Sequence, residues 1–214
     1  MCVAEHFRDQ GKHVLYLADS ITRMAEAHRE VALASGEAAS LRGYPPSVAH
    51  QIMALSERAG PGRDAVGAIT ALLTVLVAGS DMEEPVADIL RGVLDGHVVM
   101  DRTIAERGRF PAIDVLRSVS RSLPQCARPE ENARLAEARR LMGAYDRAEL
   151  MIQAGLYERG SDPLVDRAIL LWPALDAFVT ETAPGGIRQS FARLAQCLEP
   201  PVTPRPGTAS PRRA

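Results

Sequence analysis

Apolar runs alternate with segments of helical periodicity over the first half of the chain. The run from Val14 to Ala18 leads into Asp19 and predicts a fully buried parallel strand. Ala68–Val77 predicts a second strand, and His97–Met100 a short third one. Helices are predicted between them, with loops at 36–46, 60–62 and 80–85; the helices cover Ala4–Gln10, Ser20–Ala34, Ser47–Ala59 (capped by Ser47) and Val86–Val93. This alternation predicts an α/β fold with a mostly parallel, doubly wound sheet and flanking helices.

The pattern changes near Pro129, where strand-like runs stop. Three amphipathic helices are predicted beyond it, and Pro173 is expected to kink or break the second; they cover Glu130–Ala154, Leu164–Thr180 and Ile187–Leu198. Residues 200–214 are rich in proline, arginine, serine and threonine and predict a disordered tail. The sequence therefore predicts an α/β domain at 1–128, an all-helical domain at 129–199 and a tail at 200–214.

Composition narrows the class of protein. The chain has 214 residues, of which 46% are hydrophobic, enough for one substantial domain or two small ones. Its net charge of −2 provides no basic field of the kind that nucleic acids attract. Three scattered cysteines without metal-ligand spacing, and no signal peptide, fit a reducing cytosol. The longest apolar run, 65–79, is shorter than the roughly 20 residues of a membrane-spanning helix.

Asp19 is the first candidate for chemistry. An aspartate at the end of an apolar strand is where a Walker B residue positions Mg²⁺, although many such aspartates only cap the next helix. Arg23 follows one helical turn later. It could support the Asp19 carboxylate or pair with Glu26 on the surface, and the pattern leaves both open.

A phosphate-binding loop cannot be found in this sequence. The motif G-x-x-x-x-G-K-[ST] needs glycines, a lysine and a hydroxyl to hold phosphates and Mg²⁺. Lys12 is the only lysine and follows Gly11, but His13 comes next and His6 stands where the first glycine is required. No frame of the sequence satisfies the motif.

The most specific segment runs from Pro111 to Arg121, with Pro-Ala-Ile-Asp followed by Ser-Val-Ser-Arg. It resembles the signature of rotary-type ATPase catalytic subunits, and most closely that of the flagellar and type III secretion export ATPases. The resemblance extends from about Ala4 to Leu198 and is carried by further segments at 7–12, 19–23, 42–47, 81–88, 94–102, 106–111 and 145–168. The last of these resembles the export branch in particular.

This resemblance implies a partial RecA-like core, from the Walker B strand to the arginine finger, followed by a helical domain. It implies ATP and Mg²⁺ as cofactors, with Asp19 at the metal and Arg23 beside it. Phe110 would contact adenine, where the sequence alone favours core packing. Arg121 would be the finger that reaches a phosphate on a neighbouring subunit, because a guanidinium is planar, charged and bidentate. The alternative for Arg121 is a salt bridge to Asp114 or a nearby acid.

The resemblance also implies partners and a location. It implies a homohexamer, or assembly with full-length ATPase subunits, that hydrolyses ATP to export flagellar or virulence substrates. Export-apparatus proteins would be contacts, nucleic acid would not, and the location would be cytoplasmic and peripheral to the inner membrane. The family's N-terminal barrel, phosphate-binding loop and catalytic glutamate are missing, so we expect the chain alone to be inactive and aggregation-prone. The alternative is a non-catalytic module or gene remnant that assembles with a full-length ATPase.

Overall fold

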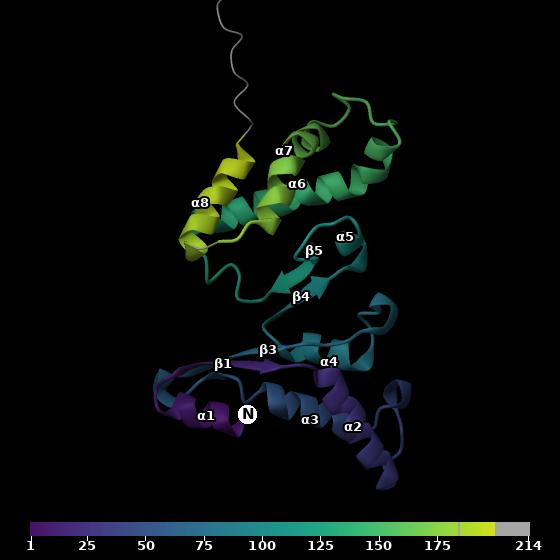
Figure 1. Cartoon of the computed structure of the whole chain (residues 1–214), viewed down its shortest axis with the longest axis vertical. Coiled ribbons are helices and arrows are strands. Elements are labelled where there is room, and N and C mark those ends of the chain that lie inside the picture. The colour runs from purple at the N-terminus through teal and green to yellow at the C-terminus, as the bar shows by residue number, and fades with distance from the viewer. Residues whose placement is uncertain (184, 200–214) are drawn as a thin grey trace, which may run out of the picture. The chain divides into compact units, whose positions relative to one another are not determined.

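The computed structural model describes residues 1–183 and 185–199. It divides into two compact units, Met1–His97 and a second that begins at Val98 (Figure 1). The predicted α/β pattern, with flanking helices and a helical C-terminal region, is confirmed. The predicted tail at 200–214 lies outside the described residues.

The first unit contains a three-stranded sheet of order β1-β3-β2. Strands β1 and β3 are parallel, so that Val14 pairs with Ile69 and Leu17 with Leu72. Strand β2 is a two-residue antiparallel partner within the 60–62 segment that was expected to be a loop. The elements of this unit are α1 (Cys2–Asp9), β1 (His13–Ala18), α2 (Ile21–Ala34), η1 (Leu41–Gly43), α3 (Pro46–Ser56), β2 (Gly60–Pro61), η2 (Arg63–Ala65), β3 (Ala68–Leu73), η3 (Ala78–Ser80) and α4 (Pro85–Val93).

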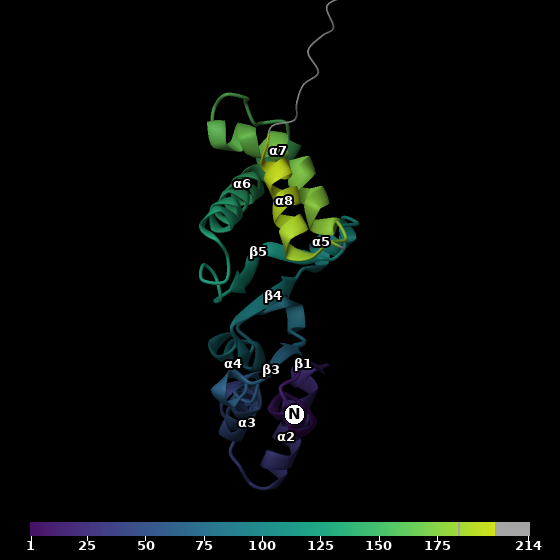
Figure 2. The same ribbon diagram turned by 90° about the vertical axis from the view of Figure 1, so that its left-hand side faces the viewer.

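Helices α2, α3 and α4 form the core of the first unit. Each contributes two fully buried aliphatic or alanine side chains: Ile21 and Ala25, Val48 and Ile52, and Val86 and Leu90. The end of the sheet joins this core, since Ala18 of β1 and Leu73 of β3 pack against it. Figures 1 and 2 show α1, α2 and α3 on the same side of β1 and β3.

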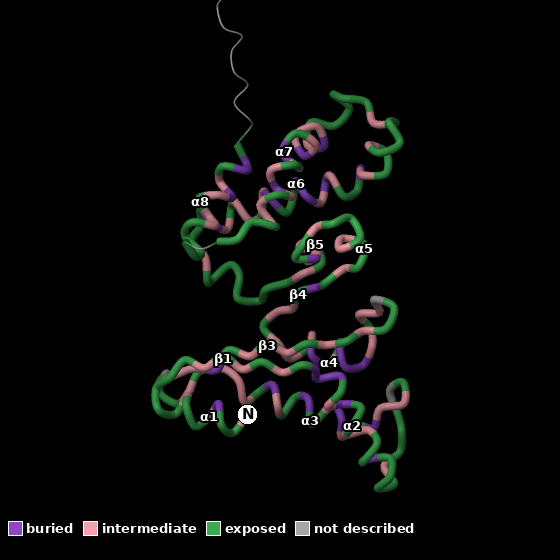
Figure 3. Tube along the Cα trace, in the orientation of Figure 1, coloured by how far each residue is buried: buried purple, intermediate pink, exposed green. Residues whose placement is uncertain are grey.

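The prediction that β1 is fully buried is wrong. Its residues alternate between exposed and half-buried, and Leu15 and Leu17 are 61% and 65% exposed. Leu72 of β3, the register partner of Leu17, is 57% exposed. Figure 3 shows the colours of exposed and half-buried residues along most of β1 and β3. We call the surface formed by Leu15, Leu17 and Leu72 the open face. Parallel sheets are normally covered on both faces, and the helices of the first unit cover this sheet on one.

Two local predictions in the first unit are also corrected. Helix α3 begins at Pro46, with Pro45 in the capping position, so Ser47 is not its cap. The Ser47 backbone N–H and hydroxyl instead donate to the Glu37 carboxylate, at 2.9 and 2.6 Å. Strand β3 ends at Leu73 and not at Val77, because the chain turns towards η3 to begin the acidic loop.

The second unit combines a two-stranded sheet, β4-β5, with four helices of the described chain. Its elements are β4 (Gly96–Met100, whose first two residues precede the boundary between the units), α5 (Arg102–Glu106), β5 (Ile113–Ser120), α6 (Pro129–Gln153), α7 (Pro163–Thr180) and α8 (Gly186–Leu198). Strand β5 carries most of the Pro111–Arg121 signature, for which the apolar pattern predicted no strand. Irregular spacing of apolar residues along β5 explains why it was missed.

Helices α6, α7 and α8 enclose the second core, as their amphipathic patterns predicted. Helix α7 runs through Pro173 without a break, so of the kink or break expected at this proline the break does not occur. Leu171 and Leu175 on either side of this proline are only 1% and 2% exposed, and their burial offsets the cost of about 3 kcal/mol for an interior proline. None of the described helices is long and apolar enough to cross a membrane.

Candidate functional site

Asp19 and Thr74 lie together at the carboxyl ends of two adjacent parallel strands. The Thr74 hydroxyl donates to Asp19 Oδ1 at 2.6 Å, and the Thr74 backbone N–H donates to the Ala18 carbonyl at 3.0 Å. Ligands of α/β proteins bind at this edge of a sheet. Thr74 was not singled out from the sequence, because a threonine after an apolar run has no distinctive spacing.

The segment after Asp19 is anchored on both sides. Ser20 caps α2 by accepting from the Arg23 backbone N–H at 3.4 Å, and it is almost fully buried. Thr22 Oγ1 accepts from the Leu76 N–H at 2.9 Å, which joins the start of α2 to the segment after β3. These contacts hold the Asp19 carboxylate at the sheet edge while leaving it exposed.

The Arg23 side chain is exposed at the first turn of α2. Within residues 1–183 and 185–199 it forms an ion pair with neither Asp19 nor Glu26. Neither of the two pairings predicted for Arg23 is therefore formed in this part of the chain.

The residues around Asp19 fit one kind of magnesium site. Mg²⁺ in phosphoryl-transfer enzymes keeps several waters and is held by one or two carboxylates together with substrate phosphates. Asp19 provides one exposed carboxylate, and no group of three or more His, Cys, Asp or Glu ligands occurs among the described residues. The donor set therefore fits an ion held mainly by water and phosphate, and does not form a protein cage.

Phe110 and Arg121 belong to the second unit, where they stand at the two ends of β5. The Phe110 ring is 64% exposed, so it is not packed in a core. Its neighbour Arg109 is largely buried and fixes the loop: Arg109 Nη2 donates to the Ile113 carbonyl at 2.8 Å, and Nη1 lies 3.1 Å from Asp176 Oδ1. The contacts of Arg109 therefore fix the backbone beside Phe110, while the Phe110 ring itself is exposed.

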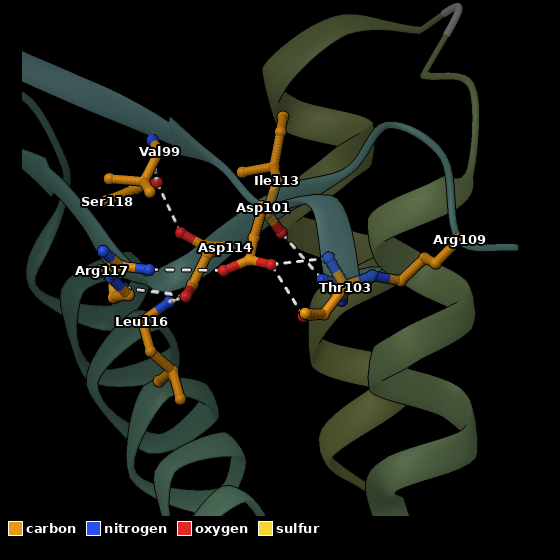
Figure 4. A network of polar contacts seen from close by, with 9 residues as sticks. All are labelled: Val99, Asp101, Thr103, Arg109, Ile113, Asp114, Leu116, Arg117 and Ser118. Atoms are coloured by element: carbon orange, nitrogen blue, oxygen red, sulfur yellow. Dashed lines mark hydrogen bonds and ion pairs between the residues drawn. The ribbon is translucent and has the colours of Figure 1, made fainter. Parts of the chain in front are cut away.

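Arg121 directly follows β5 and is exposed. The Asp114 carboxylate, its alternative partner from the sequence, accepts from the backbone N–H groups of Leu116 and Arg117 at 2.9 and 3.0 Å. Ser118 of the signature donates to the Asp114 carbonyl at 2.5 Å and accepts from the Val99 N–H at 2.9 Å. The signature residues thus brace the strand that leads to Arg121 (Figure 4).

Asp101 extends this network from the end of β4 (Figure 4). It accepts from the Thr103 hydroxyl and backbone N–H at 2.7 and 2.8 Å and lies 3.3 Å from Arg117 Nη1. The Thr103 hydrogen bonds, with the Arg117 charge, lower the pKa of Asp101 below its ordinary value. Its place before a helical turn is a capping signal that could have identified it in the sequence.

A cavity of about 380 Å³ in the second unit is partly lined by residues of this network, among them Asp101 and Asp114. Its lining includes Tyr145 and Trp172, whose rings stack at 4.0 Å, and the ion pairs Arg107–Glu149 and Arg109–Asp176. Neither Phe110 nor Arg121 lines it. The predicted site residues are therefore surface groups at element ends and do not share this cavity.

Comparison with known proteins identifies the family. Residues 1–120 match the ATP synthase alpha/beta family, nucleotide-binding domain, and residues 127–196 match the T3SS EscN ATPase C-terminal domain. The flagellum-specific ATP synthase of Caulobacter vibrioides is 48% identical over 206 residues, covering 93% of this chain and 46% of that protein. The SPI-2 type 3 secretion system ATPase of Salmonella typhimurium is 48% identical over 180 residues, covering 84% of this chain and 41% of that protein.

A solved structure agrees with the sequence relatives. The assembled ATPase EscN of the enteropathogenic E. coli type III secretion system superposes with a TM-score of 0.87 at 39% identity, over 92% of this chain and 48% of that chain. The chain spans about half the length of the relatives that it matches. It belongs to the ATP synthase alpha/beta family, in the branch of the flagellar and type III secretion ATPases.

Proposed function

We propose that this chain is part of an ATP-hydrolysing export ATPase that energises flagellar or type III protein secretion. The observation that carries the proposal is the exposed Arg121 at the end of the braced strand β5, in a segment that resembles the signature of that family; Arg121 directly follows the family match over residues 1–120. Arg121 serves as the arginine finger. Its charge stabilises the phosphoryl oxygens of the transition state on a neighbouring subunit.

The geometry of β5 supports two separate nucleotide contacts. The strand has eight residues, which span about 25 Å at the usual strand rise. Phe110 precedes the strand and Arg121 follows it, so the two side chains serve different nucleotides. Phe110 stacks on the adenine of one ATP, whereas Arg121 reaches a phosphate bound to the next subunit of a ring.

Asp19 would hold Mg²⁺ at the edge of the β1-β3 sheet, and the Thr74 hydroxyl orients its carboxylate. The metal supplies charge neutralisation at the phosphates. Arg23 supports the Asp19 carboxylate when the nucleotide is bound. These roles require phosphate-binding groups that no frame of this sequence provides, so the chain by itself does not hydrolyse ATP.

The assembly is a homohexamer or a mixed ring with full-length ATPase subunits, in the cytoplasm and peripheral to the inner membrane. One solved relative is the assembled ATPase EscN, and another structure is of EscN in complex with its central stalk EscO. Export-apparatus proteins and secretion substrates are the further partners, and nucleic acid is not one. We place the boundary between core and helical domain near residue 128, and the meeting of the two family matches between 120 and 127 supports this.

A second candidate function is a non-catalytic module, or a gene remnant, that assembles with a full-length export ATPase. The open face favours it, because three exposed leucines on a parallel sheet are an incomplete surface. This candidate and the first differ in whether Arg121 contributes to turnover by a neighbouring subunit.

A mixing experiment tests the proposed function. The chain is combined with the full-length Caulobacter vibrioides relative, in which the arginine aligned with Arg121 is replaced by alanine, and ATP turnover is measured. We expect the chain alone to match the buffer blank and the mixture to regain turnover by a factor of about 10³ or more, as arginine fingers do in trans. The Arg121→Ala chain should give no gain. If the chain alone hydrolyses ATP and Arg121→Ala abolishes this turnover, the proposed inactivity of the chain is contradicted. If the mixture shows no gain in turnover, the gene remnant is favoured.

A further inference from the structure

Arg139 of α6 grips the backbone of β5 at three points. Its Nη1 donates to the Val115 carbonyl at 2.8 Å and to the Ser118 carbonyl at 3.3 Å, and its Nη2 donates to the Leu116 carbonyl at 2.8 Å. Arg139 lies 21 to 24 positions along the sequence from the three residues whose carbonyls it binds. A long-range guanidinium contact of this kind holds one element on another and is not a local cap.

The contact fits the donors of an arginine side chain and the backbone carbonyls of β5 that need donors. Within the described residues β5 has β4 as its strand partner, so part of its backbone bonds outside a sheet ladder. A guanidinium presents several donors in a rigid plane, so one side chain satisfies three carbonyls at once. Hydrogen bonds from a charged donor are also the stronger kind.

The gripped stretch ends just before the signature arginine. Val115 and Leu116 pack against the helical core, which seats the middle of β5 on the helices. Ser118 is the last carbonyl that Arg139 holds, and Arg121 is three residues further on. Movement of the Ser118 backbone would therefore be passed to Arg121 with little chain between them to absorb it.

We propose that Arg139 is a positioning residue for Arg121. By holding the end of β5 on α6, Arg139 fixes the position of the Arg121 guanidinium. Arg139 does not itself contact the nucleotide. The catalytic part of this inference rests on the proposed function of Arg121. The structural part, that Arg139 holds the backbone leading to Arg121, stands on the three hydrogen bonds.

The next residue on α6 provides a matched control. Arg140 is exposed and carries the same charge, and its side chain forms no hydrogen bond or ion pair within residues 1–183 and 185–199. Arg139→Gln and Arg140→Gln therefore change the net charge equally and sit in the same helix. They differ in the contact with β5.

Hydrogen exchange of the full chain tests the structural part. In Arg139→Gln we expect the amides of residues 116–122 to exchange about tenfold faster or more, because local opening no longer breaks charged hydrogen bonds. Arg140→Gln should stay within about twofold of the original chain. Equal exchange in all three proteins would overturn the inference, whatever the ATPase assays show.

The mixing experiment tests the catalytic part. The Arg139→Gln chain should enter the complex as well as the original chain does, yet reduce the regained kcat by about 10- to 100-fold with the KM for ATP unchanged, as expected for a misplaced catalytic group. Arg139→Lys should not restore it, because an ammonium cannot span three carbonyls. Full turnover in Arg139→Gln would overturn the inference. If the original chain gives no gain, the proposed function fails, and hydrogen exchange alone decides whether Arg139 holds the segment.

Discussion

The two units of this chain differ in how they complete their cores. In the second unit, three helices close around residues such as Leu171, which is 1% exposed. In the first unit, helices cover one side of the sheet, and Leu17 on the other side is 65% exposed. The second unit thus buries its apolar side chains among its own helices, whereas the first unit leaves the leucines of its open face exposed.

The candidate site residues show the same difference. Asp19 in the first unit is held at its carboxylate by one hydroxyl, from Thr74. Strand β5 in the second unit is braced by the Asp114 and Ser118 contacts and by Arg139, before the chain reaches Arg121. The comparison indicates that the segment before Arg121 is held by several contacts within its own unit, whereas the Asp19 carboxylate is held by one hydroxyl.

The largest expected effect separates the stabilities of the two units. Leu171→Ala should lower the free energy of unfolding of the second unit by about 3 kcal/mol, because it leaves a cavity in a closed core. Trp172, the only tryptophan in the chain, reports this transition by fluorescence during urea unfolding. The matched change Ile52→Ala in the first core should leave the tryptophan transition in place. An equal shift of that transition by Ile52→Ala would show that the two units unfold as one.

A smaller effect concerns the open face. Leu17→Glu should raise the fraction of soluble monomer several-fold, because it breaks an exposed apolar patch. Its cost in unfolding free energy should stay under about 1 kcal/mol, since the side chain is mainly in solvent. Sedimentation velocity and light scattering measure the outcome. Val31→Glu on α2, where the side chain is 64% exposed, is the control and should change association much less.

The smallest effect is a pH dependence of the second unit. The Arg128 guanidinium and backbone N–H bind the Glu131 carboxylate at the start of α6 and lower its pKa below the usual 4.5. A carboxyl with a lowered folded-state pKa stabilises the fold above its unfolded value, and this stability is lost as the pH falls through the folded value. Glu131→Gln should therefore be less stable than the original chain at pH 7, and the two should converge below about pH 4.5.

The same tryptophan transition, measured from pH 7 to pH 3, checks this expectation. Glu130→Gln removes a carboxyl from the neighbouring position of α6 and should keep the difference between neutral and acid pH. A constant gap between Glu131→Gln and the original chain at every pH would show that the carboxylate charge is not what stabilises this helix start.

Several parts of the fold were predicted well because their signals are local. The amphipathic period located α6, α7 and α8, and the apolar run before Asp19 located β1. The sequence also singled out Phe110 and Arg121, which the structure places exposed at the two ends of β5. Their assigned roles came from the family signature, because no spacing rule identifies an arginine finger.

Other features depend on partners distant in the sequence. Glu37, and not Ser47, became the acceptor at the start of α3, and α7 continues through Pro173 because its neighbours are buried. An apolar run such as that of β1 predicts a buried strand whether or not another element covers it, so its exposed leucines could not be predicted. The hydrogen bonds from Arg139 to β5 join residues more than 20 positions apart, and no periodicity in the sequence predicts such a contact.

The sequence by itself determined where most helices and strands form and which family the chain resembles, because propensity, periodicity and motif depend on residues close together in the chain. The nucleotide contacts that this resemblance implies stay predictions. The tertiary structure alone decided which face of the β1-β3 sheet is covered, which carboxylate caps which helix and what holds the strand before Arg121. Those outcomes follow from burial and hydrogen bonding between elements, which exist only once the chain has packed.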